Sequence, residues 1–302
     1  MRLHLSIAPM IALFALGAAA AQAQSAAPEP TLAELRASAE AGNAEAQNDL
    51  GGRLMATEDE ASLPEARRWF ERAAAAGHLE AKNNLATMLL LGLGGPADEA
   101  RGRLLRDEAA RQGSGAAHLS IAERYLRGAE GYPLDPARAL EHIRSAAELP
   151  GPIASYAQWR VAMMHLQGVG TPRDPAEAFR WVVRASDGGS GRAMISRAVM
   201  LATGEGVTED DAAARIWYQR AAESGDPLFA HALRSLGAML VIGEGGPPDL
   251  ARGIAYLRIA AAADDAAAPE LLDRWATRVT PDIDVQAQRI ADQWIQRHLS
   301  ND

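Results

Sequence analysis

The sequence predicts an all-α fold: a right-handed α/α solenoid of about six to seven helical hairpins, with a C-terminal capping helical hairpin. Three observations predict it. Glycines that end similar helical phrases recur every 35 to 38 residues, at positions 42, 77, 113, 151, 188 and 225. The phrase "WFERAAAAGH" at 69–78 returns almost unchanged as "WYQRAAESGD" at 217–226. The chain is 48% hydrophobic but only 5% aromatic, a composition that suits closely packed helices rich in alanine.

The first helix of each unit, helix A, is marked by an alanine followed four residues later by an apolar residue beside a small one. The marker recurs as Ala46/Leu50-Gly51, Ala81/Leu85-Ala86, Ala117/Ile121-Ala122, Ala157/Val161-Ala162 and Ala232/Leu236-Gly237. In one unit Arg197 stands where the apolar residue is expected. This spacing indicates an amphipathic helix of about three to four turns.

A turn containing Gly-x-Gly or a near variant follows helix A, as at Gly92-Leu93-Gly94 and Gly204-Glu205-Gly206. Glycine there supplies the positive φ that ends a helix. Asp135-Pro136 and Asp174-Pro175 then predict an N-cap and first residue for a second helix, helix B. In helix B a small residue precedes a bulky one by three positions, as in Ala66/Trp69 and Ala214/Trp217. We interpret the bulky residue, which is His142 in one unit, as a packing wedge.

These residues together resemble the Sel1-like repeat, a relative of the tetratricopeptide repeat. The resemblance covers about Thr31 to Asp265 and implies a scaffold for protein interactions. Two departures stand out: "MATEDEASLPEA" replaces the Gly-x-Gly turn of the first unit, which predicts an irregular loop, and the cysteine pairs of some secreted members are absent.

The ends of the chain predict further segments. Residues 1–23 have a positive Arg2, an apolar stretch and an Ala21-Gln22-Ala23 cleavage site, which indicates a signal peptide cleaved after Ala23. A retained membrane anchor is the alternative. We therefore expect a periplasmic or secreted protein without stable membrane insertion, with a linker at 24–30, the solenoid at 31–265 and a helical cap at 266–302. Pro281 lies at a break in the cap, and Trp275 and Trp294 are expected to pack under the last repeat.

The sequence argues against most chemistry. A net charge of −9 disfavours nucleic acid as a partner, and the absence of cysteine excludes thiolate metal sites. No G-x-S-x-G or H-E-x-x-H motif occurs. We therefore expect no enzyme activity, no cofactor and no metal. The alternatives are a hydrolase acting on the cell wall or on β-lactams, and a glycan-binding protein.

What remains is a surface for a protein or peptide partner in the cell envelope. By analogy with tetratricopeptide arrays, helix A lines the concave face, and its outward positions run from polar through aromatic to basic. The residues expected to bind the partner are Asn48, Asn83, Glu123, Tyr156, Trp159, Arg192, His231 and Arg234. Tyr and Trp beside Arg suit a protein interface. Ordinary packing between repeats is an equally weighted interpretation of Tyr156 and Trp159.

Overall fold

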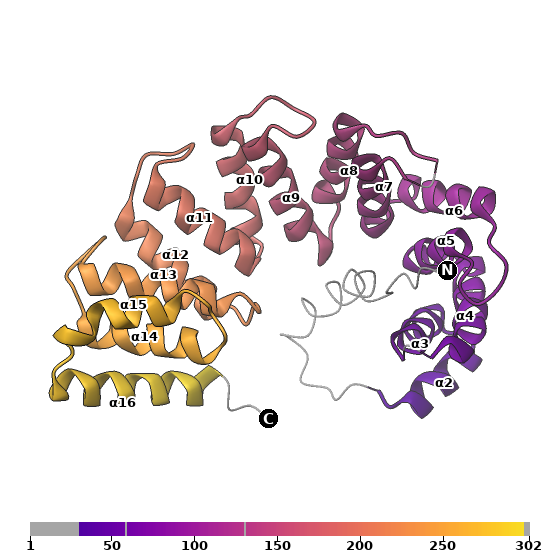
Figure 1. Cartoon of the computed structure of the whole chain (residues 1–302). Coiled ribbons are helices and arrows are strands. Elements are labelled where there is room, and N and C mark those ends of the chain that lie inside the picture. Colours follow the sequence, from indigo (N-terminus) through magenta and orange to yellow (C-terminus); the bar gives the residue numbers. More distant parts are fainter. Residues whose placement is uncertain (1–29, 58, 130, 299–302) are drawn as a thin grey trace, which may run out of the picture. The chain divides into compact units, whose positions relative to one another are not determined.

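A computed structural model describes residues 30–57, 59–129 and 131–298, and within these residues the chain is helical without strands (Figure 1). The predicted signal peptide and most of the linker lie outside them. The A helices are α3 (Ala44–Ala56), α5 (Leu79–Leu91), α7 (Gly115–Arg127), α9 (Ile153–Gln167), α11 (Gly191–Thr203) and α13 (Phe229–Ile242). The B helices are α4 (Leu63–Ala75), α6 (Glu99–Arg111), α8 (Pro136–Glu148), α10 (Pro175–Asp187), α12 (Asp211–Ala222) and α14 (Leu250–Ala262). The predicted succession of helical hairpins is confirmed.

Additional helices flank these pairs. Helix α2 (Leu32–Glu40) precedes the first pair, and α15 (Ala268–Trp275), the 3-10 turn η3 (Ala276–Arg278) and α16 (Pro281–His298) follow the last. The chain divides into two compact units, residues 1–157 and 158–302, and the division falls within α9. In unit 1 each A helix packs on the B helix that follows it, and α5 also contacts α7. In unit 2, α14 packs against both α15 and α16.

The start of each helix B is fixed by the same two hydrogen bonds in five pairs. An aspartate N-cap accepts a backbone N–H with its carboxylate, as Asp210 does from Ala213 at 2.9 Å. Its own N–H binds a carbonyl near the end of helix A at 2.8–2.9 Å, as Asp210 binds Leu201. The first helix pair lacks the aspartate N-cap and its two hydrogen bonds. There the predicted irregular loop contains the 3-10 turn η2 (Glu60–Ser62), and the Ser62 hydroxyl donates to the equivalent carbonyl, that of Leu54, at 2.7 Å.

The two glycines of the Gly-x-Gly turn have different structural roles. The first ends helix A in the left-handed conformation, as at Gly204 with φ +68°. The second, at Gly206, also has a positive φ and lies against the first residue of helix B in the preceding pair. A Cβ atom on Gly206 would stand 2.1 Å from the Pro175 carbonyl oxygen, and one on Gly245 would stand 2.3 Å from that of Asp211. The backbone of the Gly-x-Gly turn therefore lies in direct contact with the backbone at the start of helix B in the preceding pair. Glycine permits this contact and so sets the spacing between consecutive pairs.

The wedge residues are buried as predicted in two units. Trp69 and Trp181 are almost wholly buried, and the indole N–H of each donates to a glutamate one turn earlier. The Arg72 guanidinium lies over the Trp69 ring at 4.8 Å, and Arg184 repeats this contact over Trp181. Each arginine covers one face of its indole ring, which adds a cation–π contact to the burial of the tryptophan.

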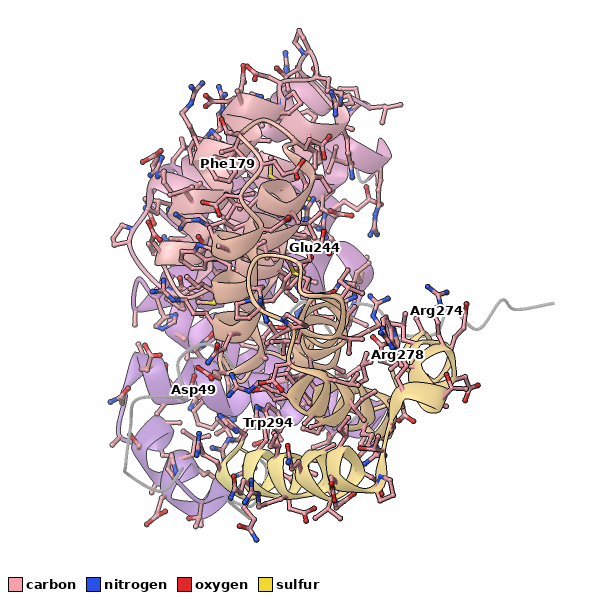
Figure 2. All side chains as sticks on the ribbon, turned by 90° about the vertical axis from the view of Figure 1, so that its left-hand side faces the viewer. Asp49, Phe179, Glu244, Arg274, Arg278 and Trp294 are labelled. Carbon is pink, nitrogen blue, oxygen red and sulfur yellow. The ribbon has the colours of Figure 1, made fainter. Side chains whose placement is uncertain are left out.

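The C-terminal helices close the core of unit 2. Trp294 of α16 is buried and stacks on Phe229 with ring centroids 5.6 Å apart, and Trp275 packs against the same core. Figure 2 shows Trp294 between α16 and the helices that precede it. Both tryptophans therefore pack as the sequence predicted, and Pro281 is the first residue of α16, directly after the break.

Glycines within helices give a clean test of this packing. A Cβ atom on Gly253 of α14 would stand 2.5 Å from Val241 Cγ2 and 2.9 Å from the Gly237 carbonyl oxygen, whereas one on Gly52 of α3 would meet nothing within 4 Å. We expect Gly253→Ala to lower the free energy of unfolding by about 1 to 3 kcal/mol through overpacking. The matched control Gly52→Ala should raise it by up to about 1 kcal/mol, because alanine favours helix. Equilibrium urea denaturation measures both, and equal effects would contradict the close approach of α13 and α14.

Candidate interaction surface

The predicted binding residues lie on A helices, and the structure shows that most of them contact the neighbouring pair. In unit 1, Asn48 is half-buried and its Oδ1 accepts a hydrogen bond from Asn84 Nδ2 of α5 at 3.0 Å. Beside it, Glu45 lies 2.9 Å from His78 Nε2. His78 is also the N-cap of α5, where its Nδ1 accepts the Ala81 N–H. Polar side chains therefore join consecutive A helices along this face.

The outward orientation expected for Asn83 is wrong, because the side chain is only 6% exposed. Helix α5 is buried along nearly its whole length, since it lies between α4, α6 and α7. Thr87, one turn later, is equally buried and accepts a hydrogen bond from Arg106 of α6 at 2.9 Å. Helix α5 is therefore mostly core in this unit.

The two remaining candidates of unit 1 are half-exposed. Glu123 of α7 forms an ion pair with Arg127 at 2.7 Å, and Tyr156 lies near the start of α9. Both keep surface that a partner can reach. That all eight residues bind a partner stays a prediction.

In unit 2, Trp159 is the best-positioned aromatic candidate. Its indole N–H donates to Ser196 Oγ of α11 at 3.1 Å, and the Arg192 guanidinium lies 5.7 Å from the ring centroid. All three side chains are half-exposed. Trp159 thus packs between consecutive repeats, as the second interpretation of this residue predicted, and still presents part of its surface to solvent beside a cation.

The last two candidates form a short network at α13. His231 Nδ1 lies 2.6 Å from Arg234 Nη2, and Arg234 forms an ion pair with Asp265 at 3.2 Å. Asp265 in turn accepts the backbone N–H groups of Ala267 and Ala268. Burial lowers the pKa of His231, and the positive charge of Arg234 lowers it further, although Asp265 opposes both. Arg234 therefore holds the loop before α15 as well as offering charge at the surface.

The structure explains the arginine that broke the helix A pattern. Arg197 stacks on Trp217 with its guanidinium carbon 3.9 Å from the ring centroid, and it forms an ion pair with Asp187 at 2.9 Å. Arg220 covers the same ring at 4.6 Å. The arginine at this position therefore contacts the Trp217 ring through its guanidinium, and the same charge pairs with a carboxylate of the preceding repeat.

A histidine pair replaces the aromatic wedge in α8. The Nδ1 atoms of His118 and His142 lie 3.0 Å apart, and the Tyr125 ring stacks on His142 at 5.8 Å between centroids. Burial lowers the pKa of His118, as does the neighbouring His142, whereas a hydrogen bond to the Ala110 carbonyl raises it. His118 therefore donates from Nε2, so its Nδ1 accepts a hydrogen bond from the Nδ1–H of His142. This hydrogen bond requires a neutral His118 ring, and burial favours the neutral form of both rings.

The described part of the chain holds no group of three or more His, Asp or Glu side chains placed to bind a metal ion. None of its helices combines the length and the apolar composition that crossing a bilayer requires.

Comparison with known proteins defines the family. The Sel1 repeat matches six consecutive segments, at residues 44–78, 79–114, 115–150, 155–190, 191–226 and 230–265. The chain belongs to the Sel1 repeat family. Sel1 repeat proteins generally act as scaffolds for protein–protein interaction and are typically not enzymes.

Two crystal structures share the fold. A protective antigen with an SLR fold, present in uropathogenic Escherichia coli strains, is 26% identical with a TM-score of 0.67; the match covers 88% of this chain and 56% of the antigen. A Sel1 repeat protein from Oxalobacter formigenes is 23% identical with a TM-score of 0.61, over 78% of this chain and 100% of that protein. The chain spans little more than half the length of the first of these relatives.

Sequence reasoning missed one surface feature. A groove of about 740 Å³ lies in unit 2 among α12, α13, α14 and α16. Its signal was Ile216, an apolar residue at a B-helix position where three other Sel1 repeats of this chain carry Arg68, Glu141 and Arg180, although a fourth carries Leu104.

The histidine pair predicts a pH dependence of stability. Burial also lowers the pKa of His142, although Asp107 and Glu141 oppose this effect. Because both pKa values are below 6.5 in the folded protein, the unfolded chain binds more protons as the pH falls below about 7, and the free energy of unfolding falls with it. Above that pH the contribution is fully present. We expect the free energy of unfolding, measured by urea denaturation at several pH values between 5 and 7, to change less steeply with pH in His142→Phe than in wild type. Phenylalanine keeps a ring against Tyr125.

His231 and the carboxylates are present in both proteins. The difference between the two pH dependences of the free energy of unfolding therefore reports on the His118–His142 pair. Equal slopes in wild type and His142→Phe would contradict the neutral, hydrogen-bonded arrangement.

Proposed function

We propose that the protein is a non-enzymatic scaffold of the cell envelope that binds a protein or peptide partner on its A helices. The supporting observation is the group formed by Trp159, Arg192 and Ser196 in unit 2. Its members come from two repeats and hold each other in place through a hydrogen bond and a cation–π contact, yet remain half-exposed. An aromatic ring and a guanidinium fixed before binding lose little entropy when a partner docks.

The envelope location rests on the signal-peptide pattern of residues 1–23. A chain that reaches an oxidising compartment without cysteines needs no disulfide to fold, because repeat packing supplies its core. A regulatory role fits a protein that acts by binding a partner rather than by catalysing a reaction.

The first test compares partner capture by the wild type and three variants. Immobilised wild type is incubated with envelope extract, and bound proteins are identified by mass spectrometry. We expect Trp159→Ala and Arg192→Glu to reduce recovery of the specific partner about tenfold, as loss of an interface anchor does. Arg68→Glu makes the same charge change on the exposed face of α4 and should leave recovery unchanged. Arg234 is unsuitable for this test because it also holds Asp265.

Circular dichroism establishes that each variant remains folded. A partner recovered equally by wild type and both α9–α11 variants would place binding elsewhere and remove the A helices from the proposal.

The second test concerns export. When the full chain is expressed in a Gram-negative host, we expect the periplasmic protein to begin at Gln24, because cleavage follows Ala23. Intact-mass measurement of the periplasmic fraction checks this, and a chain lacking residues 2–23 serves as the control that stays in the cytoplasm. Recovery of an unprocessed chain from the membrane fraction would favour the retained anchor instead.

A further inference from the structure

The groove beside α12 has a shape and composition of its own. Helices α12 and α14 each pack against α13, and the groove lies between them on the side of the B helices. One wall is the loop between α13 and α14, which carries the Glu244 labelled in Figure 2 and continues with Gly245, Gly246, Pro247 and Pro248. Two prolines and the contact of Gly245 with the start of α12 make this wall rigid.

The lining combines apolar and polar side chains. Leu236 and Leu240 of α13 form the buried floor, and Ile216 of α12, Tyr256 of α14 and Ile283 of α16 form the sides. Ile216 is 54% exposed, although its counterparts in three other repeats are charged. A volume of about 740 Å³ lies within the usual range of about 300–1,000 Å³ for binding sites, so the groove accepts a few side chains rather than a folded domain.

The charged side chains of the groove make its rim positive. Arg215 and Arg252 line it, and Asp249 is the acidic residue among the lining side chains. Asp249 is engaged with Arg252 at 3.5 Å and with the backbone N–H of Arg252 at the helix start. Arg215 contacts the Pro247 carbonyl at 3.4 Å and carries its charge at the edge of the groove. This lining bears one net positive charge in a chain whose formal charge is −9.

We propose that this groove of unit 2 is a second docking site, which binds an extended segment of a partner protein with one large apolar side chain beside an acidic residue. The apolar side chain lies between Ile216 and Tyr256, and the carboxylate reaches Arg215. Tyrosine and arginine are the residue types that dominate interface energetics, and a rigid wall limits the entropy lost on docking. The inference rests on the scaffold function but not on the A-helix surface.

The experiment selects peptides on the purified protein. A phage library of random 12-residue peptides is panned against wild type, and the enriched peptides are synthesised and measured by isothermal titration calorimetry. We expect them to share an apolar residue next to Asp or Glu. Replacing that acid by its amide should weaken binding, and added salt should weaken it too, because the contact with Arg215 is electrostatic.

Two variants place the site. Ile216→Arg installs the residue type found at positions 68 and 180, and should weaken the selected peptides about tenfold or more. Tyr256→Phe preserves packing and should weaken only peptides that bind the phenol. Leu104→Arg is the matched control, since Leu104 occupies the same helix B position in another repeat and is 67% exposed. It should leave binding unchanged.

Peptides that bind Ile216→Arg as tightly as wild type, or that share no acidic residue, would overturn the proposal, as would a selection without enrichment. Sedimentation velocity of wild type and Ile216→Arg tests self-association. A change of oligomeric state in the variant would assign the groove to a second copy of the chain, also against the proposal. In either case the capture experiment with Trp159 and Arg192 variants still decides whether the scaffold function stands.

Discussion

Close approach between backbones is the constraint on which the rest of this protein depends. At Gly206 and Gly245 a single hydrogen atom occupies the space between one repeat and the carbonyl group that begins helix B of the repeat before it. Because any side chain would collide there, the distance between repeats is set by main chain, and main-chain geometry hardly varies with sequence. A stack built in this way keeps its register even though the side chains around it change from repeat to repeat.

That freedom is visible where individual repeats depart from the pattern. Ser62 satisfies with its hydroxyl the Leu54 carbonyl whose equivalents elsewhere bind the backbone N–H of an aspartate. Arg197, at a position where other repeats carry an apolar residue, stacks its guanidinium on Trp217 and adds an ion pair with Asp187. The His118–His142 pair fills a wedge position with two small polar rings. In each case a different side chain takes over the structural role of the residue that other repeats carry there.

The consequence for function is that the surface side chains, rather than the packing between consecutive helices, differ from repeat to repeat. Polar and aromatic side chains on the A helices are fixed by contacts with the next repeat, as Trp159 is by Ser196. On the opposite side of unit 2, apolar Ile216 stands where charged residues occur in other repeats, at the edge of a groove. Binding surfaces that are already ordered need little rearrangement, which favours recognition of a flexible segment from a partner.

The amino-acid sequence by itself determined the helical class, the succession of pairs, and the caps and turns, because each depends on the spacing of residues along the chain. Only the tertiary structure decided which helix faces are accessible. Asn83 reads as an outward residue from its position in the repeat, yet α7 and its other neighbours bury it. The groove at Ile216 likewise depends on how far α12, α14 and α16 lie from one another, a distance between segments that local periodicity does not encode.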